Sequence, residues 1–282
     1  MYICHLKTHD TLIMKGIIGA IAGAVIGSAY EFNPTRDYTF ELFTPKSTFT
    51  DDTVLTMANA IWLLEDEKHR PETLVKIMLD LCRRYPDRGY GGRFAQWIRK
   101  TDPQPYNSFG NGSAMRVSPI GYYAQTLDEA LELARISAEV THNHPEGVKG
   151  AQATAAAIFL VRQGENKWDL REYVEKTFDY DLSRKLDEIR PTFTFDETCQ
   201  RTVPEAITCY LEGKDYEDVV RLAVALAGDA DTLAAIAGSI ASAVWDVSSE
   251  VSQQVISLLS EEFCTTLLRF NELVAKREQD KK

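Results

Sequence analysis

Residues 16–30 form the most apolar stretch of the chain and read GIIGAIAGAVIGSAY. Gly19, Gly23 and Gly27 recur at every fourth position, so one face of a helix here would carry no side chains. The stretch is shorter than the roughly 20 apolar residues that a membrane-spanning helix needs. The pattern therefore predicts a helix at the centre of a bundle, whose bare face lets another backbone approach closely.

Apolar residues at helical spacing recur along most of the remaining chain. We expect further helices at residues 53–66, 71–84, 126–140, 146–162, 168–177, 202–212, 215–227, 232–246, 251–259 and 261–277. One alternating stretch, residues 192–195, is too short to build a sheet. Three segments lack the periodicity and are expected to be irregular, namely residues 32–49, 101–121 and 179–200. The sequence thus predicts an all-α fold.

No linker-like segment and no internal repeat divides the chain. We therefore expect a single domain at residues 15–277. Residues 1–14 are expected to be an N-terminal extension, because Met14 can serve as the first residue of the domain. Residues 278–282 are expected to be a polar tail.

The 282 residues include 31 Lys and Arg against 42 Asp and Glu, which gives a net charge of −11 with neutral histidine. A surface this acidic repels phosphate backbones, so nucleic-acid binding is not expected. The five cysteines form no Cys-x-x-Cys pair, which is typical of reduced thiols in a cytoplasmic protein. Because no apolar stretch is long enough to span a bilayer, no membrane association is expected.

Two short acidic motifs precede unusually apolar helices. They are TDDT at residues 50–53 and GDADT at residues 228–232. Each motif by itself has a structural interpretation, since Thr50 or Asp231 can cap a helix N-terminus. Acidic residues in a first helical turn also complement the helix dipole.

Taken together, the two motifs favour a metal site. Four carboxylates buried at the mouths of interior helices would carry a severe desolvation cost without a cation, and neither motif contains Lys or Arg. Ligands that are all oxygen, with no His or Cys, favour a hard cation such as Mg²⁺, Mn²⁺ or Ca²⁺. Four carboxylates can hold two divalent ions about 3.5–4 Å apart, a spacing that serves to polarise substrate oxygens.

Three further features carry polar groups that suit a ligand. Residues 109–116, FGNGSAMR, contain glycines whose backbone N–H groups can converge on an anion, although an ordinary turn has the same composition. Residues 141–146, THNHPE, either offer an imidazole to a phosphate or ribose, or cap a helix at Pro145. Glu31, directly after the apolar helix, is either a solvated terminus or an acid/base at a cleft.

These motifs resemble those of the ADP-ribosylglycohydrolases, a family that includes the dinitrogenase-reductase-activating glycohydrolase and the ADP-ribosyl-arginine and ADP-ribosyl-serine hydrolases. The resemblance rests on GAIAGAVIGSAYEF at 19–32, FTDDT at 49–53, FGNGSAMRVSPIG at 109–121 and AGDADTLAAIAGSIA at 227–241, with a weaker block at 141–142. The blocks follow the family's order. They imply a compact, single-domain orthogonal helical bundle with a two-metal cleft.

The resemblance also implies roles for individual residues. The expected ligands of two divalent cations, Mg²⁺ in the first place and Mn²⁺ as the alternative, are Thr50, Asp51, Asp52, Asp229, Asp231 and Thr232. The expected contacts to substrate are Phe109, Gly110, Asn111, Gly112, Ser113, Met115 and His142, while Arg116 shapes the loop or contacts the ligand. The expected catalytic carboxylates are Glu31, Asp52 and Asp229. Ala230 stands where many members carry a small hydroxyl.

The implied activity is metal-dependent cleavage of the C1″ glycosidic bond between ADP-ribose and a protein side chain or a small conjugate. ADP-ribose would be the product. The alternatives are an inactive relative that binds ADP-ribose or has a structural, crystallin-like role, and a helical interaction module in which the motifs are mere caps. Arginine, serine, an acetyl ester and a base stay open as the leaving group, which loops 32–49, 86–108 and 179–200 are expected to select. The oligomeric state also stays open.

Overall fold

The glycine-striped stretch forms helix α1 (Ile18–Gly27), and every residue of this helix is buried. The computed structural model describes residues 15–280. After α1, the chain forms α2 (Asp51–Glu65), α3 (Pro71–Arg84), α4 (Gly92–Ile98), the 3₁₀ helix η2 (Asn111–Ser113), α5 (Ser118–Tyr123), α6 (Leu127–Glu139), α7 (Pro145–Arg162), α8 (Lys167–Phe178), α9 (Leu186–Ile189), α10 (Cys199–Glu212), α11 (Tyr216–Val224), α12 (Ala230–Ala241), α13 (Ser249–Leu258) and α14 (Glu261–Asp280). The described residues contain no β-strand, as the sequence predicted.

The bare face of α1 packs directly on the backbone of α12. A Cβ atom added at Gly23 would lie 2.1 Å from the carbonyl oxygen of Ala234, and one added at Gly27 would lie 2.4 Å from that of Ala230. No real side chain fits at such distances, so glycine is what permits this approach. The two contacts run in opposite directions along the two helices. The C-terminus of α1 therefore lies beside the N-terminus of α12.

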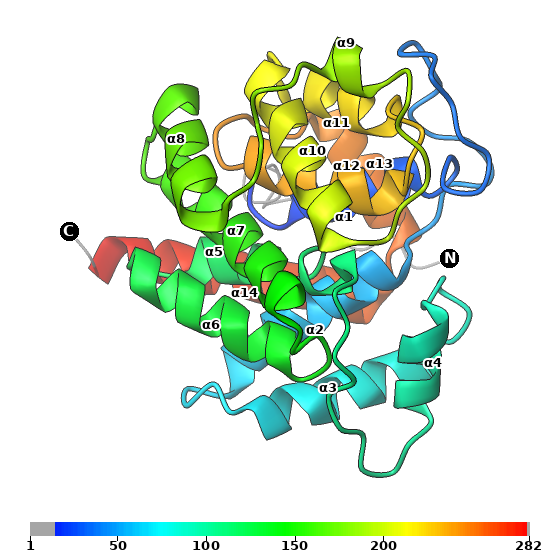
Figure 1. Ribbon diagram of the computed structural model, residues 1–282. Coiled ribbons are helices and arrows are strands. Elements are labelled where there is room, and N and C mark those ends of the chain that lie inside the picture. The colour runs from blue at the N-terminus through cyan, green and yellow to red at the C-terminus, as the bar shows by residue number, and fades with distance from the viewer. Residues whose placement is uncertain (1–14, 281–282) are drawn as a thin grey trace.

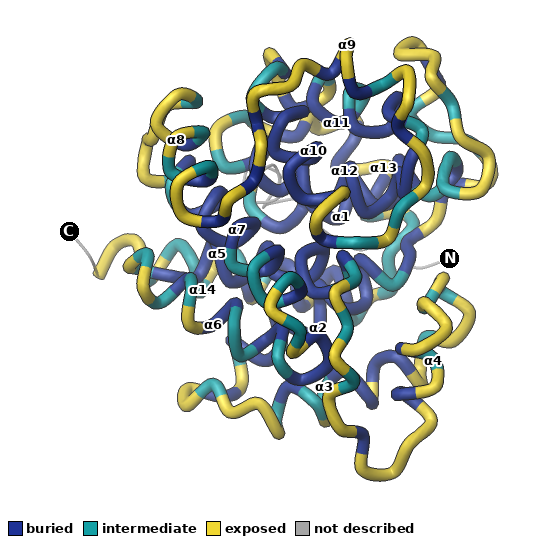
Figure 2. Tube along the Cα trace, in the orientation of Figure 1, coloured by how far each residue is buried: buried dark blue, intermediate teal, exposed yellow. Residues whose placement is uncertain are grey.

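Most of the remaining helices form two groups around this pair (Figure 1). One group consists of α10, α11 and α13, which pack with α1 and α12; the other consists of α2, α3, α5, α6 and α14, and α7 contacts both groups. Buried residues run without interruption through the middle of both groups, and exposed residues lie on the outside (Figure 2). The expected single, compact, all-α domain is confirmed.

The long helices were predicted to within a few residues, whereas three short ones were not predicted. These are α4, α5 and α9, which have at most seven residues each. Such helices are too short to show a repeating apolar face. The 3₁₀ helix η2 and the start of α5 lie within the segment 101–121, and α9 lies within the segment 179–200, both of which were expected to be irregular.

The two ends of the domain stay predictions. The N-terminal extension expected at residues 1–14 lies outside the described residues. Helix α14 continues to Asp280, so the first residues of the predicted tail at 278–282 are helical. Among residues 15–280, none of the helices is both long and apolar enough to cross a bilayer.

Candidate active site

The antiparallel packing of α1 and α12 brings three carboxylates together. Glu31 follows the end of α1, while Asp229 and Asp231 lie at the start of α12. One oxygen from each of these three side chains falls within 4.8 Å of the others. The close contact between α1 and α12 thus brings together residues that are about two hundred positions apart in the sequence.

The N-terminus of α2 reaches the same place and adds Asp51 and Asp52. The hydroxyl groups of Thr50 and Thr232 each donate to Oδ2 of Asp52, at 3.4 Å in both cases. Asp52 thus joins the beginning of α2 to the beginning of α12. We call Glu31, Asp51, Asp52, Asp229 and Asp231 the acidic end of the site. The N-termini of two helices meet there, and their dipoles favour negative charge.

Side-chain capping by Thr50 or Asp231 is wrong, whereas acidic residues do lie in the first turns of α2 and α12, where they complement the helix dipoles. Thr50 and Asp229 occupy the N-cap positions of α2 and α12, and neither side chain caps its helix. Asp231, the expected cap, lies inside the first turn of α12. The carboxylate of Asp229 instead accepts a hydrogen bond from Nδ2 of Asn111 at 2.7 Å. The polar groups of both motifs are consequently available to a ligand.

No basic side chain of the described residues pairs with the acidic end. Among residues 15–280, none of its five carboxylates forms an ion pair with Lys, Arg or His. Loss of hydration and mutual repulsion raise the pKa of Glu31 and of Asp51 to about 8, and they raise the pKa of Asp52 and of Asp229 well above the usual range. Burial raises the pKa of Asp231 as well. Such a cluster is costly unless protons or cations bind to it.

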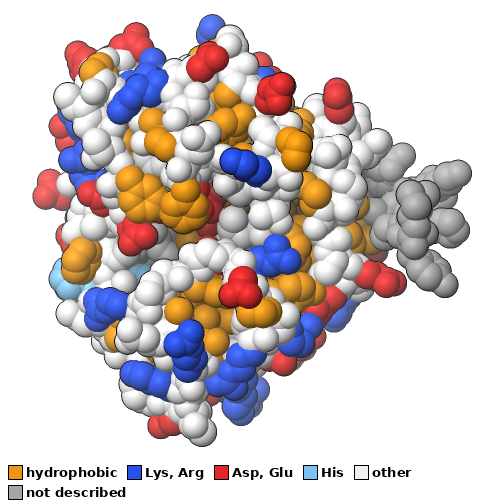
Figure 3. Space-filling view, turned by 90° about the vertical axis from the view of Figure 1, so that its right-hand side faces the viewer, with side chains coloured by type: hydrophobic (Ala, Val, Ile, Leu, Met, Phe, Trp, Pro, Cys, Tyr) orange, Lys and Arg blue, Asp and Glu red, His pale blue; other side chains and the backbone are white. Residues whose placement is uncertain are grey.

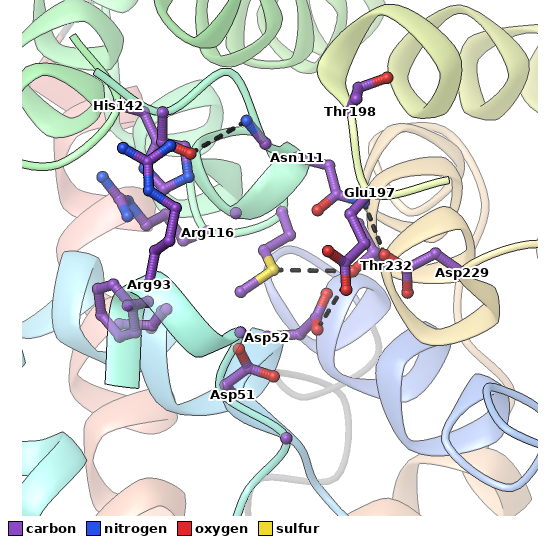
Figure 4. A pocket seen from close by; sticks show the side chains of 18 of the residues that line it. Asp51, Asp52, Arg93, Asn111, Arg116, His142, Glu197, Thr198, Asp229 and Thr232 are labelled. Atoms are coloured by element: carbon purple, nitrogen blue, oxygen red, sulfur yellow. Dashed lines mark hydrogen bonds between the residues drawn. The ribbon is translucent and has the colours of Figure 1, made fainter. Parts of the chain in front are cut away.

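These carboxylates line one end of a cavity of about 420 Å³, a size typical of small-ligand sites. In Figure 3, acidic side chains are visible inside a hollow near the middle of the molecular face, and basic side chains gather below it. Figure 4 shows Arg93, Arg116 and His142 on the opposite side of the cavity from the carboxylates. We call these three residues, together with residues 109–112, the loop end.

The glycine-rich loop of the loop end is held by a second segment. The backbone N–H of Asn111 donates to the carbonyl oxygen of Glu197 at 2.7 Å, and that of Cys199 donates to the carbonyl oxygen of Phe109 at 3.0 Å. Gly112 packs against the imidazole of His142, because an added Cβ would lie 3.2 Å from Nε2. The loop is therefore fixed on both sides before any ligand binds.

The two histidines of the THNHPE segment have different roles. His144 is the N-cap residue of α7, where its Nδ1 accepts from the backbone N–H of Glu146 at 3.1 Å. His142 is buried and lines the cavity. Burial and the nearby charge of Arg116 lower the pKa of His142 well below its ordinary value. The capping and ligand-contact interpretations thus apply to different residues of one segment.

Most of the residues that the sequence selected border the cavity, and two do not. Glu31, Asp51, Asp52, Phe109, Gly110, Asn111, Gly112, Met115, Arg116, His142, Asp229, Asp231 and Thr232 line it. Thr50 lies just behind Asp52. Ser113, expected as a ligand contact, is turned away and donates to the carbonyl oxygen of Gly147 at 2.7 Å. Ser113 therefore supports the loop from behind, and the roles of the lining residues stay predictions.

Several lining residues escaped the sequence analysis. They are Leu55, Gly89, Gly91, Gly92, Arg93, Phe94, Tyr106, Ser108, Glu197 and Thr198. Apart from Leu55, they lie in the segments 86–108 and 179–200, which were expected to border the cleft, whereas residues 32–49 contribute none. In the sequence, the glycines at 89, 91 and 92 were the one available signal that these segments border the cavity. Only the fold reveals that Glu197 faces the acidic end, where its charge raises the pKa of Glu31 and of Asp51.

Comparisons with known proteins agree with this geometry. A family model described as ADP-ribosylglycohydrolase matches residues 7–282. The ADP-ribosylhydrolase ARH3 of Homo sapiens is 27% identical over 304 aligned positions, which cover 81% of this chain and 84% of the relative. The ADP-ribosylarginine hydrolase Tri1 of Pseudomonas putida is 28% identical over 164 positions, covering 54% of this chain and 42% of the relative.

A solved structure shares the fold. It is described as an ADP-ribosylglycohydrolase-related protein complex, and it superposes with a TM-score of 0.72 at 22% sequence identity. The superposition covers 95% of this chain and 100% of the other.

Proposed function

This chain belongs to the ADP-ribosylglycohydrolases, enzymes that hydrolyse glycosidic bonds, and we propose that it releases ADP-ribose from a modified protein side chain or a small ADP-ribosyl conjugate. The scissile bond joins C1″ of the distal ribose to the leaving atom. The observation that carries the proposal is a single cavity with five carboxylates at one end and a fixed glycine loop with Arg116 and His142 at the other.

We propose that the acidic end holds two divalent cations, Mg²⁺ in the first place and Mn²⁺ as the alternative. The fit rests on chemistry present in the chain: the donors are all oxygens, and Oδ1 of Asp52 is buried without a hydrogen-bond partner among the described residues. The ligands would come from Thr50, Asp51, Asp52, Asp229, Asp231 and Thr232. Glu31 lies close to Asp229 and Asp231. Bound divalent ions would supply Lewis acidity and orient the ribose hydroxyls.

The residues at the two ends of the cavity would have different roles, one in substrate binding and one in bond cleavage. At the loop end, the backbone of Gly110–Gly112 and the imidazole of His142 would bind the diphosphate and the nucleoside. This fixes C1″ at the acidic end, where carboxylates stabilise the positive charge that develops on the sugar ring. Asn111 joins both ends, because its side chain holds Asp229 while its backbone is fixed by Glu197.

One carboxylate would transfer the proton in this reaction. As the C1″ bond breaks, its electron pair goes to the leaving atom, and the oxygen of a water molecule bonds to C1″ while losing a proton. Glu31, Asp52 and Asp229 are the candidates for receiving that proton or for protonating the leaving atom. Glu31 is the best placed of the three, because it is only partly buried and one of its carboxylate oxygens lies within 4.8 Å of those of Asp229 and Asp231.

The test is release of free ADP-ribose from a panel of conjugates linked through arginine, serine, an acetyl ester and a base. Each would be incubated with the purified protein in Mg²⁺, in Mn²⁺ and in EDTA. We expect release from at least one conjugate with a divalent ion and none in EDTA. Binding of ADP-ribose without release from any conjugate would contradict the hydrolase and favour an inactive binding protein. Absence of both binding and release would contradict the site itself.

A further inference from the structure

A chain of buried hydrogen bonds leads from the middle of the bundle to the imidazole at the loop end. Arg116 is fully buried between α5, α6 and the cavity. Its Nη2 donates to the backbone carbonyl of Ser137 and, at 3.0 Å, to the hydroxyl of Thr141. Oγ1 of Thr141 lies 2.7 Å from Nδ1 of His142. Thr141 is fully buried as well.

The direction of each bond in this chain can be assigned from the chemistry of the donors. An arginine side chain only donates hydrogen bonds. The Thr141 hydroxyl therefore accepts from Arg116, and its own hydrogen remains to be placed. Nδ1 of His142 is the acceptor that the structure offers to this hydroxyl. If Nδ1 carried the proton instead, the Thr141 hydroxyl would be a buried donor without a partner, which costs about 1–3 kcal/mol.

The opposite side of Arg116 is fixed in the same way. Its Nε approaches Oγ of Ser137 at 3.4 Å, and that hydroxyl donates to Oδ1 of Asn59 at 2.8 Å. The Nδ2 of Asn59 donates to the carbonyl oxygen of Leu55 at 2.9 Å. The guanidinium is thus held by groups of α2 and α6 that have their own partners. It cannot rotate to release Thr141 without breaking several buried bonds.

We propose that Thr141, held by Arg116, is a positioning residue that fixes His142 as the tautomer protonated at Nε2 and so presents Nε2–H to the cavity as a hydrogen-bond donor. Nε2 lies on the side of the ring that packs against Gly110 and Gly112, which line the cavity. Burial and the positive charge of Arg116 keep the imidazole neutral by lowering its pKa. A neutral donor in this place suits a phosphate or ribose oxygen; that ligand rests on the proposed function, whereas the tautomer does not.

The tautomer can be measured directly by NMR on protein labelled with ¹⁵N at its five histidines. The resonances of His142 would be assigned by their disappearance in His142→Gln. We expect a protonated, pyrrole-type nitrogen at Nε2 and an unprotonated, pyridine-type nitrogen at Nδ1. A pyrrole-type Nδ1 in the wild-type protein would overturn the proposal, even if every variant failed to fold.

Two variants of Thr141 separate positioning from packing. Thr141→Val keeps the shape and removes the hydroxyl, and Thr141→Ser keeps the hydroxyl. In Thr141→Val we expect a mixture of tautomers and about fivefold weaker binding of ADP-ribose in the presence of Mg²⁺, measured by calorimetry. In Thr141→Ser we expect the wild-type tautomer and affinity. Unchanged tautomer and affinity in Thr141→Val, or equal losses in both variants, would overturn the proposal.

The same experiment distinguishes this inference from the proposed function. If the wild-type protein shows the expected tautomer but binds no ADP-ribose, the proposed function fails and the assignment of the ligand fails with it. If the protein binds and releases ADP-ribose while Nδ1 carries the proton, the inference alone fails.

Discussion

The two ends of the cavity are built from different kinds of segment. The acidic end comes from the termini of three long helices, α1, α2 and α12, and its five carboxylates have no cationic partner among the described residues. The loop end comes largely from short or irregular segments, yet Arg116 and Asn111 form several hydrogen bonds within the protein, and Nη1 of Arg116 is buried without a partner among the described residues. The acidic end thus gathers carboxylates without a cationic partner among the described residues, whereas the irregular loop end is held in place by hydrogen bonds to neighbouring segments.

Under the proposed function, this difference would separate chemistry from recognition. Helix packing places the carboxylates close together, and bond cleavage would require such fixed positions. Their mutual repulsion lowers the stability of the fold unless protons or cations bind to them. The irregular segments that border the cavity are the parts of the site where differences in substrate would be encoded.

The largest expected effect comes from breaking the helix contact under the acidic end. Gly23→Val would drive a side chain into the backbone of Ala234, which cannot move aside. We expect a loss of about 3 kcal/mol or more in the free energy of unfolding, measured by urea denaturation or seen as insoluble protein.

The control is a glycine of the segment 86–108 that also lines the cavity. Gly91 has φ −55° and no atom within 4 Å of an added Cβ. Gly91→Ala should change the free energy of unfolding by no more than about 0.5 kcal/mol. Equal effects of Gly23→Val and Gly91→Ala would contradict the claim that the close contact between α1 and α12 requires glycine.

Removing one carboxylate should separate activity from stability. Asp231→Asn takes a charge out of the acidic end without changing the side-chain volume, and we expect ADP-ribose release to fall at least about a hundredfold. In EDTA the same variant should unfold at a higher temperature than the wild type, because less repulsion remains. Asp102→Asn, an exposed position outside this cavity, should change neither property. Retained turnover in Asp231→Asn would argue against the metal role.

The protein without divalent cations, in EDTA, should lose stability as the pH rises. Glu31 and Asp51 have pKa values raised to about 8 in the fold, against ordinary values near 4 in an unfolded chain. Between about pH 4 and pH 8 the folded state therefore binds protons that the unfolded state does not, and the free energy of unfolding falls with rising pH. We expect the melting temperature in EDTA to drop by several degrees across this range and Mg²⁺ to reverse most of the drop. A flat profile that Mg²⁺ leaves unchanged would contradict an uncompensated acidic end.

The smallest expected effects lie at the loop end. His142→Ala removes the donor that faces the cavity, and we expect ADP-ribose to bind about tenfold more weakly. Ser113→Ala, in the same loop but turned toward Gly147, should leave this affinity unchanged and lower the free energy of unfolding by about 1 kcal/mol. The reverse pattern, with affinity lost in Ser113→Ala and kept in His142→Ala, would show that the loop contacts are wrongly assigned.

The acidic end could be predicted from sequence because its residues belong to long helices. The glycines of α1 and the motifs at 50–53 and 228–232 have local patterns that point to packing and to charge, and the antiparallel contact then brings them together. Capping by Asp231 was wrong because α12 begins at Ala230, ahead of the expected start at residue 232, and capping by Thr50 was wrong because its hydroxyl donates to Asp52 instead.

The loop end could be predicted only in part. Residues 109–112 have a glycine signature, but Arg93 and Glu197 lie in segments without periodicity, and only the tertiary structure places them. Ser113 could not be distinguished from a ligand contact, since the direction of its hydroxyl depends on Gly147, a residue of another helix. Side-chain direction in an irregular loop is a property of the whole fold.

The most direct test of the account is crystallographic. Crystals grown with Mn²⁺ and ADP-ribose would be measured for anomalous scattering from the metal. The account predicts Mn²⁺ peaks between the carboxylates of Asp51 and Asp52 on one side and those of Asp229 and Asp231 on the other, with the diphosphate of ADP-ribose beside Gly110–Gly112. An acidic end without anomalous density, or ADP-ribose bound with its diphosphate among the carboxylates, would contradict it.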